Sequence, residues 1–177
     1  YCSAVLADTL RISSDPITIR VGDFGQGELL VQQWNNIPGV FVDQLIEDPD
    51  YPEHPDEIYF INQFKTDIDL SDHYGRRILG YLHAPKTADY RFWIAGDDYC
   101  ELWLSSDSLA MHRQMIAEVP GWTLPQEWGK YDLQKSSWIE LQKGECYFIM
   151  AFQKEDSGGD FVDVAWEYDG VAKHTIP

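Results

Sequence analysis

Two stretches of this chain carry oxygen-rich side chains that could hold a metal ion. The first is the adjacent pair Asp97-Asp98, which lies between two apolar runs. Neighbouring residues of a regular strand point to opposite faces, so both carboxylates can serve one site only where the backbone turns sharply or the peptide bond is cis. A divalent cation between the carboxylates would favour such a geometry. The alternative is an ordinary turn, in which aspartate is common.

The second stretch is the loop 153–160, which leaves one apolar run and enters the next. Glycines allow backbone carbonyl oxygens to turn inward, and Ca²⁺ takes about six to eight hard oxygen ligands. The sequence has no EF-hand pattern, so a calcium site here would be assembled from separate loops. The alternative is an acidic, solvated loop. The stretch contains Gln153, Lys154, Glu155, Asp156, Ser157, Gly158, Gly159 and Asp160.

Other chemistries find less support in the sequence. It has no GxSxG elbow, no glycine-rich phosphate loop and no HExxH motif. Its 30 acidic residues offer many carboxylate pairs for glycoside hydrolysis, but no arrangement singles out one pair. Three aromatic residues, Trp122, Trp128 and Tyr131, could form a surface on which sugars stack, with core packing as the alternative.

The elements that must position these residues are predicted to be strands. Apolar residues alternate with period two in many short runs joined by loops, which predicts an all-β fold, an antiparallel β-sandwich with long loops and at most short helices. We expect the run 90–95 to form a hairpin with 100–104, and 138–141 to form one with 146–152. Further strands are expected at 28–34, 78–82 and 161–167.

Helical patterns are weak and confined to two short segments, 40–46 and 108–118. The stretch 47–56 contains three prolines, which suit neither a helix interior nor a central strand, so we expect a long surface loop. Three cysteines, Cys2, Cys100 and Cys146, allow one disulfide with one thiol left over, or no disulfide.

Length and composition limit the classes of function. The chain has 177 residues, which fits one domain, and its 44% hydrophobic and 14% aromatic content excludes a disordered chain. The formal net charge of −17 would repel phosphate backbones and anionic lipid headgroups, so neither nucleic acid nor a membrane surface is expected as a partner. The sequence shows neither a long apolar run nor a signal-peptide pattern, and it reads as a mature or excised segment.

An ordered series of motifs from about Gly27 to Gly170 resembles the protective-antigen domain family, PA-14. Single motifs of this kind are weak, but their order is specific. The series comprises Asp50-Tyr51-Pro52, Pro55-Asp56, Tyr74 to Tyr81, Ala88 to Asp98, Leu102 to Asp107, Ile116-Ala117, Pro120 to Thr123, Gln134 to Ser136, Lys154-Glu155, Gly158 to Asp160, and Val164 to Trp166.

The resemblance implies a calcium site. Carbohydrate-binding members of the family hold Ca²⁺ with two consecutive aspartates joined by a cis peptide, and Asp97 and Asp98 match that pair. The family's further loop supplies an asparagine, and the corresponding loop after Lys154-Glu155 has none here, so Asp160 is expected to replace it, with Gln153 as a further candidate ligand. Backbone carbonyls of residues 157–159 would complete the site.

The resemblance also implies a function, in which vicinal sugar hydroxyls complete the coordination of the bound Ca²⁺. Residues Asp156, Ser157, Gly158 and Gly159, together with the aspartate pair, would then contact the sugar. The chain is expected to be a single domain over residues 1–177, monomeric when isolated, within a larger extracellular or cell-surface protein that serves adhesion or targeting without catalysis. The alternatives are a structural or protein-interaction domain and, on the carboxylate count alone, a glycoside hydrolase.

Overall fold

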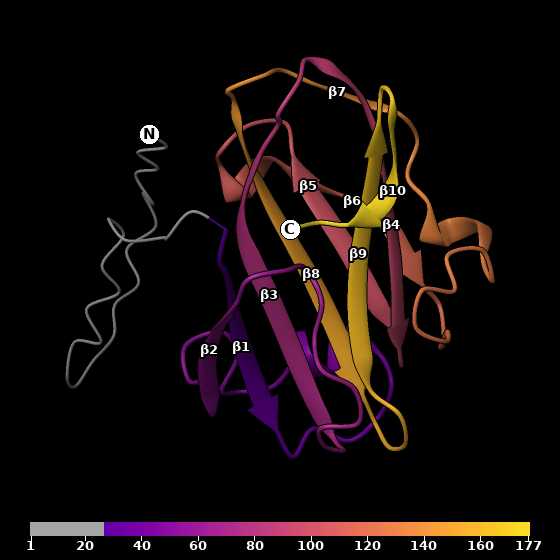
Figure 1. Ribbon diagram of the computed structural model, residues 1–177. Coiled ribbons are helices and arrows are strands. Elements are labelled where there is room, and N and C mark those ends of the chain that lie inside the picture. Colours follow the sequence, from indigo (N-terminus) through magenta and orange to yellow (C-terminus); the bar gives the residue numbers. More distant parts are fainter. Residues whose placement is uncertain (1–26) are drawn as a thin grey trace.

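The computed structural model describes residues 27–177, which form two antiparallel β-sheets packed as a sandwich (Figure 1). This confirms the predicted fold class. The strand order is β2-β1-β3-β8-β5-β6 in the larger sheet and β10-β9-β4-β7 in the smaller one. The elements are β1 (Leu29–Asn35), α1 (Val42–Ile46), β2 (Glu57–Ile61), β3 (Tyr74–His83), β4 (Ala88–Asp97), β5 (Cys100–Ser105), η1 (Ala110–His112), β6 (Arg113–Val119), η2 (Asp132–Gln134), β7 (Ile139–Leu141), β8 (Cys146–Glu155), β9 (Phe161–Tyr168) and β10 (Val171–Thr175).

The main core lies between the two sheets and is built by the alternation seen in the sequence. In β4, Tyr90, Phe92 and Ile94 share one face and are fully buried against the opposite sheet. Val162 and Val164 of the neighbouring strand β9 continue the same layer. Burial of this apolar surface fixes the register of the strands, because a slip of one residue would turn each strand's apolar side chains to the wrong face.

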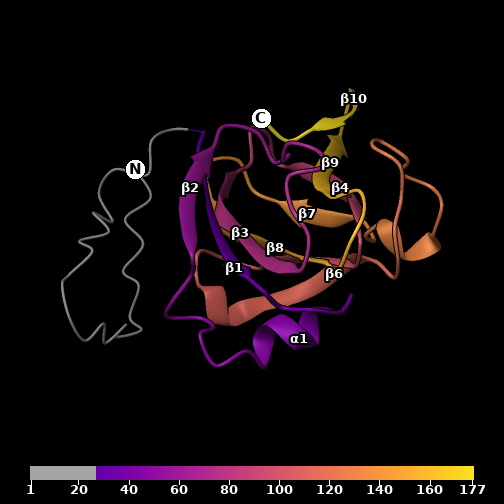
Figure 2. The same cartoon turned by 90° about the horizontal axis from the view of Figure 1, so that it is seen from below.

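A second apolar cluster covers the outer face of the larger sheet. The short helix α1 lies on that face (Figure 2), and its Val42 and Leu45 belong to one buried cluster with Phe148 and Phe152 of β8. With this cluster on one face and the main core on the other, all ten residues of β8 are buried. Gly75 permits this contact, because a Cβ atom at that position would lie 2.7 Å from Leu45 Cδ1.

Both predicted hairpins are wrong. Strand β4 belongs to the smaller sheet, where it pairs with β7 and β9, whereas β5 belongs to the larger sheet and pairs with β6 and β8. Strands β7 and β8 are likewise in different sheets. The turns after β4 and β7 carry the chain from one sheet to the other, and a turn signal between two alternating runs does not distinguish such a crossing from a hairpin.

The remaining predictions of local structure are confirmed except in one segment. The stretch 40–46 contains α1, and 47–56 is a surface segment of turns and bends. The predicted helix over 108–118 is wrong, because only η1 is helical there and 113–118 belong to the edge strand β6. Cys100 is a buried free thiol and Cys146 is disulfide-bonded, while Cys2 lies outside the described residues.

Candidate metal and ligand site

Two of the connections between sheets meet at one end of the sandwich. The β4–β5 connection contains Asp98, and the β8–β9 connection spans residues 156–160. Figure 1 shows both at the lower end, beside the start of β3. The backbone N–H of Asp156 donates to Asp98 Oδ2 at 3.2 Å, so the two connections are bonded to each other.

Three carboxylates converge at this junction. Asp97, Asp98 and Glu155 each offer one oxygen, and these oxygens all lie within 4.8 Å of one another. The peptide bond between Asp97 and Asp98 is cis, which is one of the two geometries expected from the sequence. Glu155 is the last residue of β8 and is fully buried, whereas the two aspartates are partly exposed. The opening of the cluster therefore lies on the aspartate side.

The cluster is electrostatically unfavourable when it holds no cation. Burial raises the pKa of Asp97 to about 6, and the neighbouring charge of Asp98 adds to the shift. Burial also raises the pKa of Glu155 to about 8, with further contributions from the charges of Asp98 and Asp97. Like charges at such short range favour protonation or a bound cation.

Asp160, the residue before β9, lies near enough to the cluster for its charge to act on it. Its charge raises the pKa values of both Asp97 and Glu155, although it is outside the group of three converging oxygens. Its Oδ2 accepts hydrogen bonds from the backbone N–H groups of Leu70 and Ser71, at 2.9 and 2.8 Å. The segment before β3 is thereby drawn to the junction.

Two carboxylate oxygens of this region accept no hydrogen bond from the described residues. Asp160 Oδ1 and Glu155 Oε1 are buried, and neither has a hydrogen-bond partner among the described residues. Buried carboxylate oxygens without partners are costly, and a hard cation satisfies them directly. The donor set of buried and converging carboxylate oxygens therefore fits a divalent cation such as Ca²⁺.

Gln153 takes a supporting place. Its Nε2 donates to the backbone carbonyl of Asp97 at 2.8 Å, and its Oε1 accepts from Arg76 Nη1 at 3.1 Å. Arg76 is fully buried and is also bonded to Gln33. The predicted ligand Gln153 is thus within the site, where both its amide atoms are engaged.

The predicted sugar-contacting loop has one anchored residue and three exposed residues. Asp156 is anchored, since its Oδ1 accepts from the Gly39 N–H at 2.6 Å and lies 3.1 Å from His73 Nδ1. These bonds, the Gly39 contact foremost, lower the pKa of Asp156. Ser157, Gly158 and Gly159 are exposed beside it.

Sequence reasoning missed two residues of the site. Glu155 was within the recognised loop, but its position as the buried end of β8 could not be read from the pattern. Asp69 comes from the segment before β3, about ninety residues before Gly159 in the chain. A Cβ atom placed on Gly159 would lie 3.2 Å from Asp69 Oδ1 and 3.4 Å from Asp97 Oδ2, so these carboxylates flank the loop. No sequence signal separates Asp69 from the other surface acids.

An exposed tryptophan lies in a segment that is bonded to the end of β4. The segment carrying Trp122 is fixed to the end of β4 by reciprocal bonds, in which the Thr123 N–H donates to the Gly96 carbonyl and the Gly96 N–H donates to Thr123 Oγ1. Lys130 lies over the Trp122 ring, 3.0 Å from its centroid, and its charge opposes the upward pKa shift of Asp97. Trp122 is 50% exposed, while Trp128 and Tyr131 are partly buried.

Within residues 27–177, no helix has the length and apolar character needed to span a membrane.

The fold is that of PA14 domains in solved structures. It matches a PA14 sugar-binding domain from an RTX adhesin with a TM-score of 0.58 at 13% identity, over 85% of this chain and 94% of that one. It matches the Epithelial Adhesin 9 A domain of Candida glabrata, solved with Galβ1-4GlcNAc, with a TM-score of 0.58 at 12% identity, over 84% and 88%. An anti-sigma factor domain-containing protein from Clostridium clariflavum gives 0.57 at 17% identity, over 84% of this chain but 45% of its own.

This chain spans only a small part of the length of the curated relatives that it matches. Mouse fibrocystin-L is 30% identical over 157 residues, which is 83% of this chain and 3% of the relative. Mouse N-acetyl-beta-glucosaminyl-glycoprotein 4-beta-N-acetylgalactosaminyltransferase 1 is 36% identical over 98 residues, which is 52% of this chain and 10% of the relative. No family model matches the chain. The chain is therefore a β-sandwich of the PA14 fold, as its ordered motifs indicate.

Proposed function

We propose that this domain is a calcium-dependent carbohydrate-binding module. The single observation that carries the proposal is the convergence of Asp97, Asp98 and Glu155 within 4.8 Å, next to buried carboxylate oxygens that lack partners among the described residues. The solved structures of the same fold include a sugar-binding domain and adhesin domains in complex with galactose-containing saccharides.

In this proposal the carboxylates of Asp97, Asp98, Glu155 and Asp160 hold the cation. Gln153 keeps the Asp97 carbonyl in place, and backbone carbonyls of the exposed segment 157–159 are further ligand candidates. Bound Ca²⁺ would offer open coordination positions to vicinal sugar hydroxyls. The chain's own part is to present these oxygens on one solvent-open side, bordered by Trp122, whose ring can pack against a sugar.

The proposed module binds without cleaving. This proposal gives the clustered carboxylates, whose oxygens lie within 4.8 Å of one another, the role of cation ligands rather than of catalytic groups. Because each direct hydrogen bond contributes only about 0.5–1.5 kcal/mol, binding of a monosaccharide is expected to be weak, and adhesion would use several copies or clustered ligands. We further propose that the parent protein is extracellular or on the cell surface.

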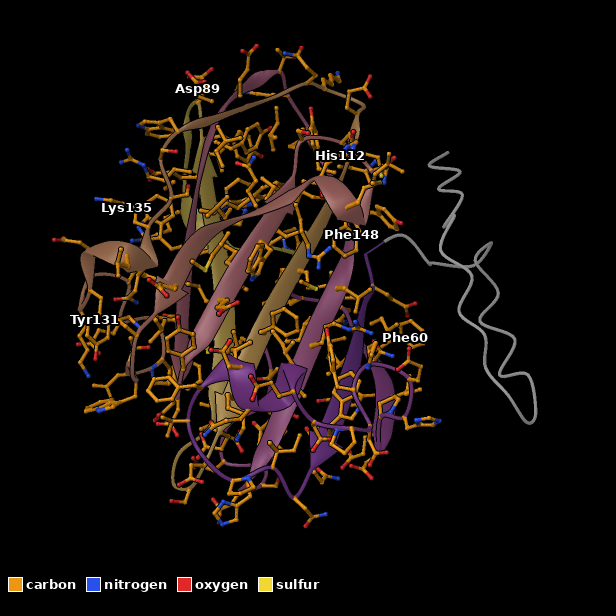
Figure 3. All side chains as sticks on the ribbon, turned by 180° about the vertical axis from the view of Figure 1, so that it is seen from behind. Phe60, Asp89, His112, Tyr131, Lys135 and Phe148 are labelled. Carbon is orange, nitrogen blue, oxygen red and sulfur yellow. The ribbon has the colours of Figure 1, made fainter. Side chains whose placement is uncertain are left out.

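Calorimetry tests the proposal directly. Ca²⁺ is titrated into chelator-treated protein, and neutral saccharides are then titrated with and without Ca²⁺. Asp97→Asn should lower the Ca²⁺ affinity at least about tenfold and abolish the heat signal of sugar binding. Asp89→Asn is the matched control, because Asp89 is exposed at the opposite end of β4 (Figure 3). Ca²⁺ binding without any sugar signal would favour the alternative, a structural or protein-interaction domain, and equal sugar binding in chelator would refute the calcium mechanism.

A further inference from the structure

A loop from the N-terminal side of the domain is tied to the junction. The N–H of Gly39, which follows β1, donates to Asp156 Oδ1 at 2.6 Å, and the N–H of Asp156 donates to Asp98 Oδ2 at 3.2 Å. The buried ammonium of Lys154 donates to the carbonyls of Ile37 and Gly39. Asp156 therefore connects the segment 36–41 to the carboxylate cluster. More than fifty residues separate this segment from Asp97 in the sequence.

This loop presents an apolar ring to solvent. Phe41 is 55% exposed, and its ring meets that of Tyr99 edge-on with centroids 5.9 Å apart. Tyr99 directly follows Asp98, and its hydroxyl donates to Glu118. The Phe41 N–H donates to Gln44 Oε1 at 2.8 Å, which fixes the backbone where α1 begins. The ring is thus held at the rim of an otherwise acidic site.

Phe41 and Trp122 lie in loops that contact the residues on either side of the aspartate pair. Thr123, which follows Trp122, is bonded to Gly96 of the smaller sheet, the residue before Asp97. Phe41 is placed beside Asp98 through Tyr99, whose carbonyl accepts from the Lys154 N–H of the larger sheet. Both rings are thus tied to residues that flank the aspartate pair, Trp122 through Thr123 and Gly96 and Phe41 through Tyr99, and Lys130 lies over the Trp122 ring.

We infer that Phe41 packs against the apolar face of a second sugar ring, in a glycan whose first sugar lies at the cation. The inference rests on the proposed function and extends it from a monosaccharide site to an oligosaccharide site. A pyranose ring has one face of C–H groups, and its burial on an exposed, immobilised aromatic ring gains apolar contact at little entropic cost. The polar edge of that sugar would face Asp156 and Ser157, next to the loop.

The test compares oligosaccharide with monosaccharide binding. A glycan array of neutral oligosaccharides, probed with the wild type in millimolar Ca²⁺, supplies the strongest oligosaccharide, and calorimetry then gives its affinity and that of its terminal monosaccharide. Phe41→Ala should lower the affinity for the oligosaccharide about threefold to tenfold and leave the affinities for the monosaccharide and for Ca²⁺ unchanged. Phe41→Tyr, which keeps the ring, should retain wild-type affinity. Phe60→Ala is the matched control, since Phe60 is 52% exposed on the edge strand β2 (Figure 3).

The outcomes separate this inference from the proposed function. If Phe41→Ala and Phe60→Ala bind the oligosaccharide as the wild type does, the second-sugar contact is overturned while the cation site stands. A loss of monosaccharide and Ca²⁺ affinity in Phe41→Ala would also overturn it, because the residue would then act on the cation site itself. No calcium-dependent signal for the wild type on the array would overturn the proposed function, and this inference with it.

Discussion

The backbone N–H of Asp98 donates a hydrogen bond to Glu155 Oε2 at 3.1 Å. This bond joins the β4–β5 connection to the end of β8 and aims one oxygen of a buried acid at the aspartate pair. The other oxygen, Oε1, has no partner among residues 27–177. Glu155 therefore has two functions that a substitution can separate: its Oε2 holds the backbone, and its charge contributes to the cluster.

Glu155→Gln is expected to stabilise the ion-free domain at pH 7.5 and to weaken Ca²⁺ binding. The amide keeps an oxygen for the Asp98 N–H, and it removes the cost of burying a carboxyl group that must either stay charged or take up a proton in the fold, where its pKa is raised to about 8. In chelator the melting temperature should rise, and the further rise produced by saturating Ca²⁺ should shrink relative to the wild type. Thermal melts with and without Ca²⁺ measure both. A variant that keeps the full calcium-induced rise would exclude Glu155 from the ligand set.

The stability of the ion-free domain should fall as the pH rises from 5 to 7. In the fold the pKa of Asp97 is raised to about 6 and that of Glu155 to about 8, above values of about 3.9 and 4.3 for the unfolded chain. The folded state then binds more protons than the unfolded state over this range, so the free energy of unfolding decreases with pH.

Urea denaturation in chelator at pH 5, 6 and 7 measures this dependence. Lys154, with a pKa lowered to about 8, acts in the opposite sense but mainly above this range. Saturating Ca²⁺ should remove the decrease, because a bound cation favours the charged carboxylates. A free energy of unfolding that rises steadily over this range in chelator would contradict the proposed electrostatics of the cluster.

Gly159→Ala is expected to weaken Ca²⁺ binding severalfold with little loss of stability. The added methyl group would lie 3.2 Å from Asp69 Oδ1 and 3.4 Å from Asp97 Oδ2, so one of these carboxylates must shift. Gly129→Ala is the control, because Gly129 is also exposed and a Cβ atom there meets nothing within 4 Å. Calorimetric Ca²⁺ titrations of the two variants should differ; equal affinities would place the cation away from this side of Asp97.

Lys154→Met is expected to lower the free energy of unfolding by about 2–4 kcal/mol. The Lys154 ammonium donates to the carbonyls of Ile37, Gly39 and Glu155, and its loss leaves these oxygens short of a donor. Urea denaturation measures the change, and Lys143→Met, at an exposed turn, is the control. An unchanged midpoint would show that the segment 36–41 is held by its other contacts.

Local patterns in the sequence predicted most strands, and they failed where pairing is decided at a distance. The apolar alternation of 90–95 and 100–104 marks both as strands, but it contains no information on which neighbour each strand finds. The partners of β4 are β7 and β9, and both lie later in the chain. In 108–118 the mixed spacing of apolar residues suggests a helix, whereas it arises from the short η1 followed by the edge strand β6, whose first three residues are exposed.

The candidate site was predictable only in part for a similar reason. Asp97 and Asp98 are adjacent, so their joint action could be proposed from the sequence and the family resemblance. Glu155 and Asp69 reach the site through the end of β8 and the segment before β3, and the contacts that bring them there are backbone hydrogen bonds such as Asp69 N–H to the Asp160 carbonyl. Bonds of this kind leave no trace in residue type.

The crossing of the chain between sheets at Asp97-Asp98 has a mechanical consequence. The aspartates continue a strand of the smaller sheet, and Glu155 ends a strand of the larger one. An ion coordinated by all three carboxylates would cross-link the two sheets at that end. Tension on a tethered ligand would then load both layers in parallel, rather than peel one from the other.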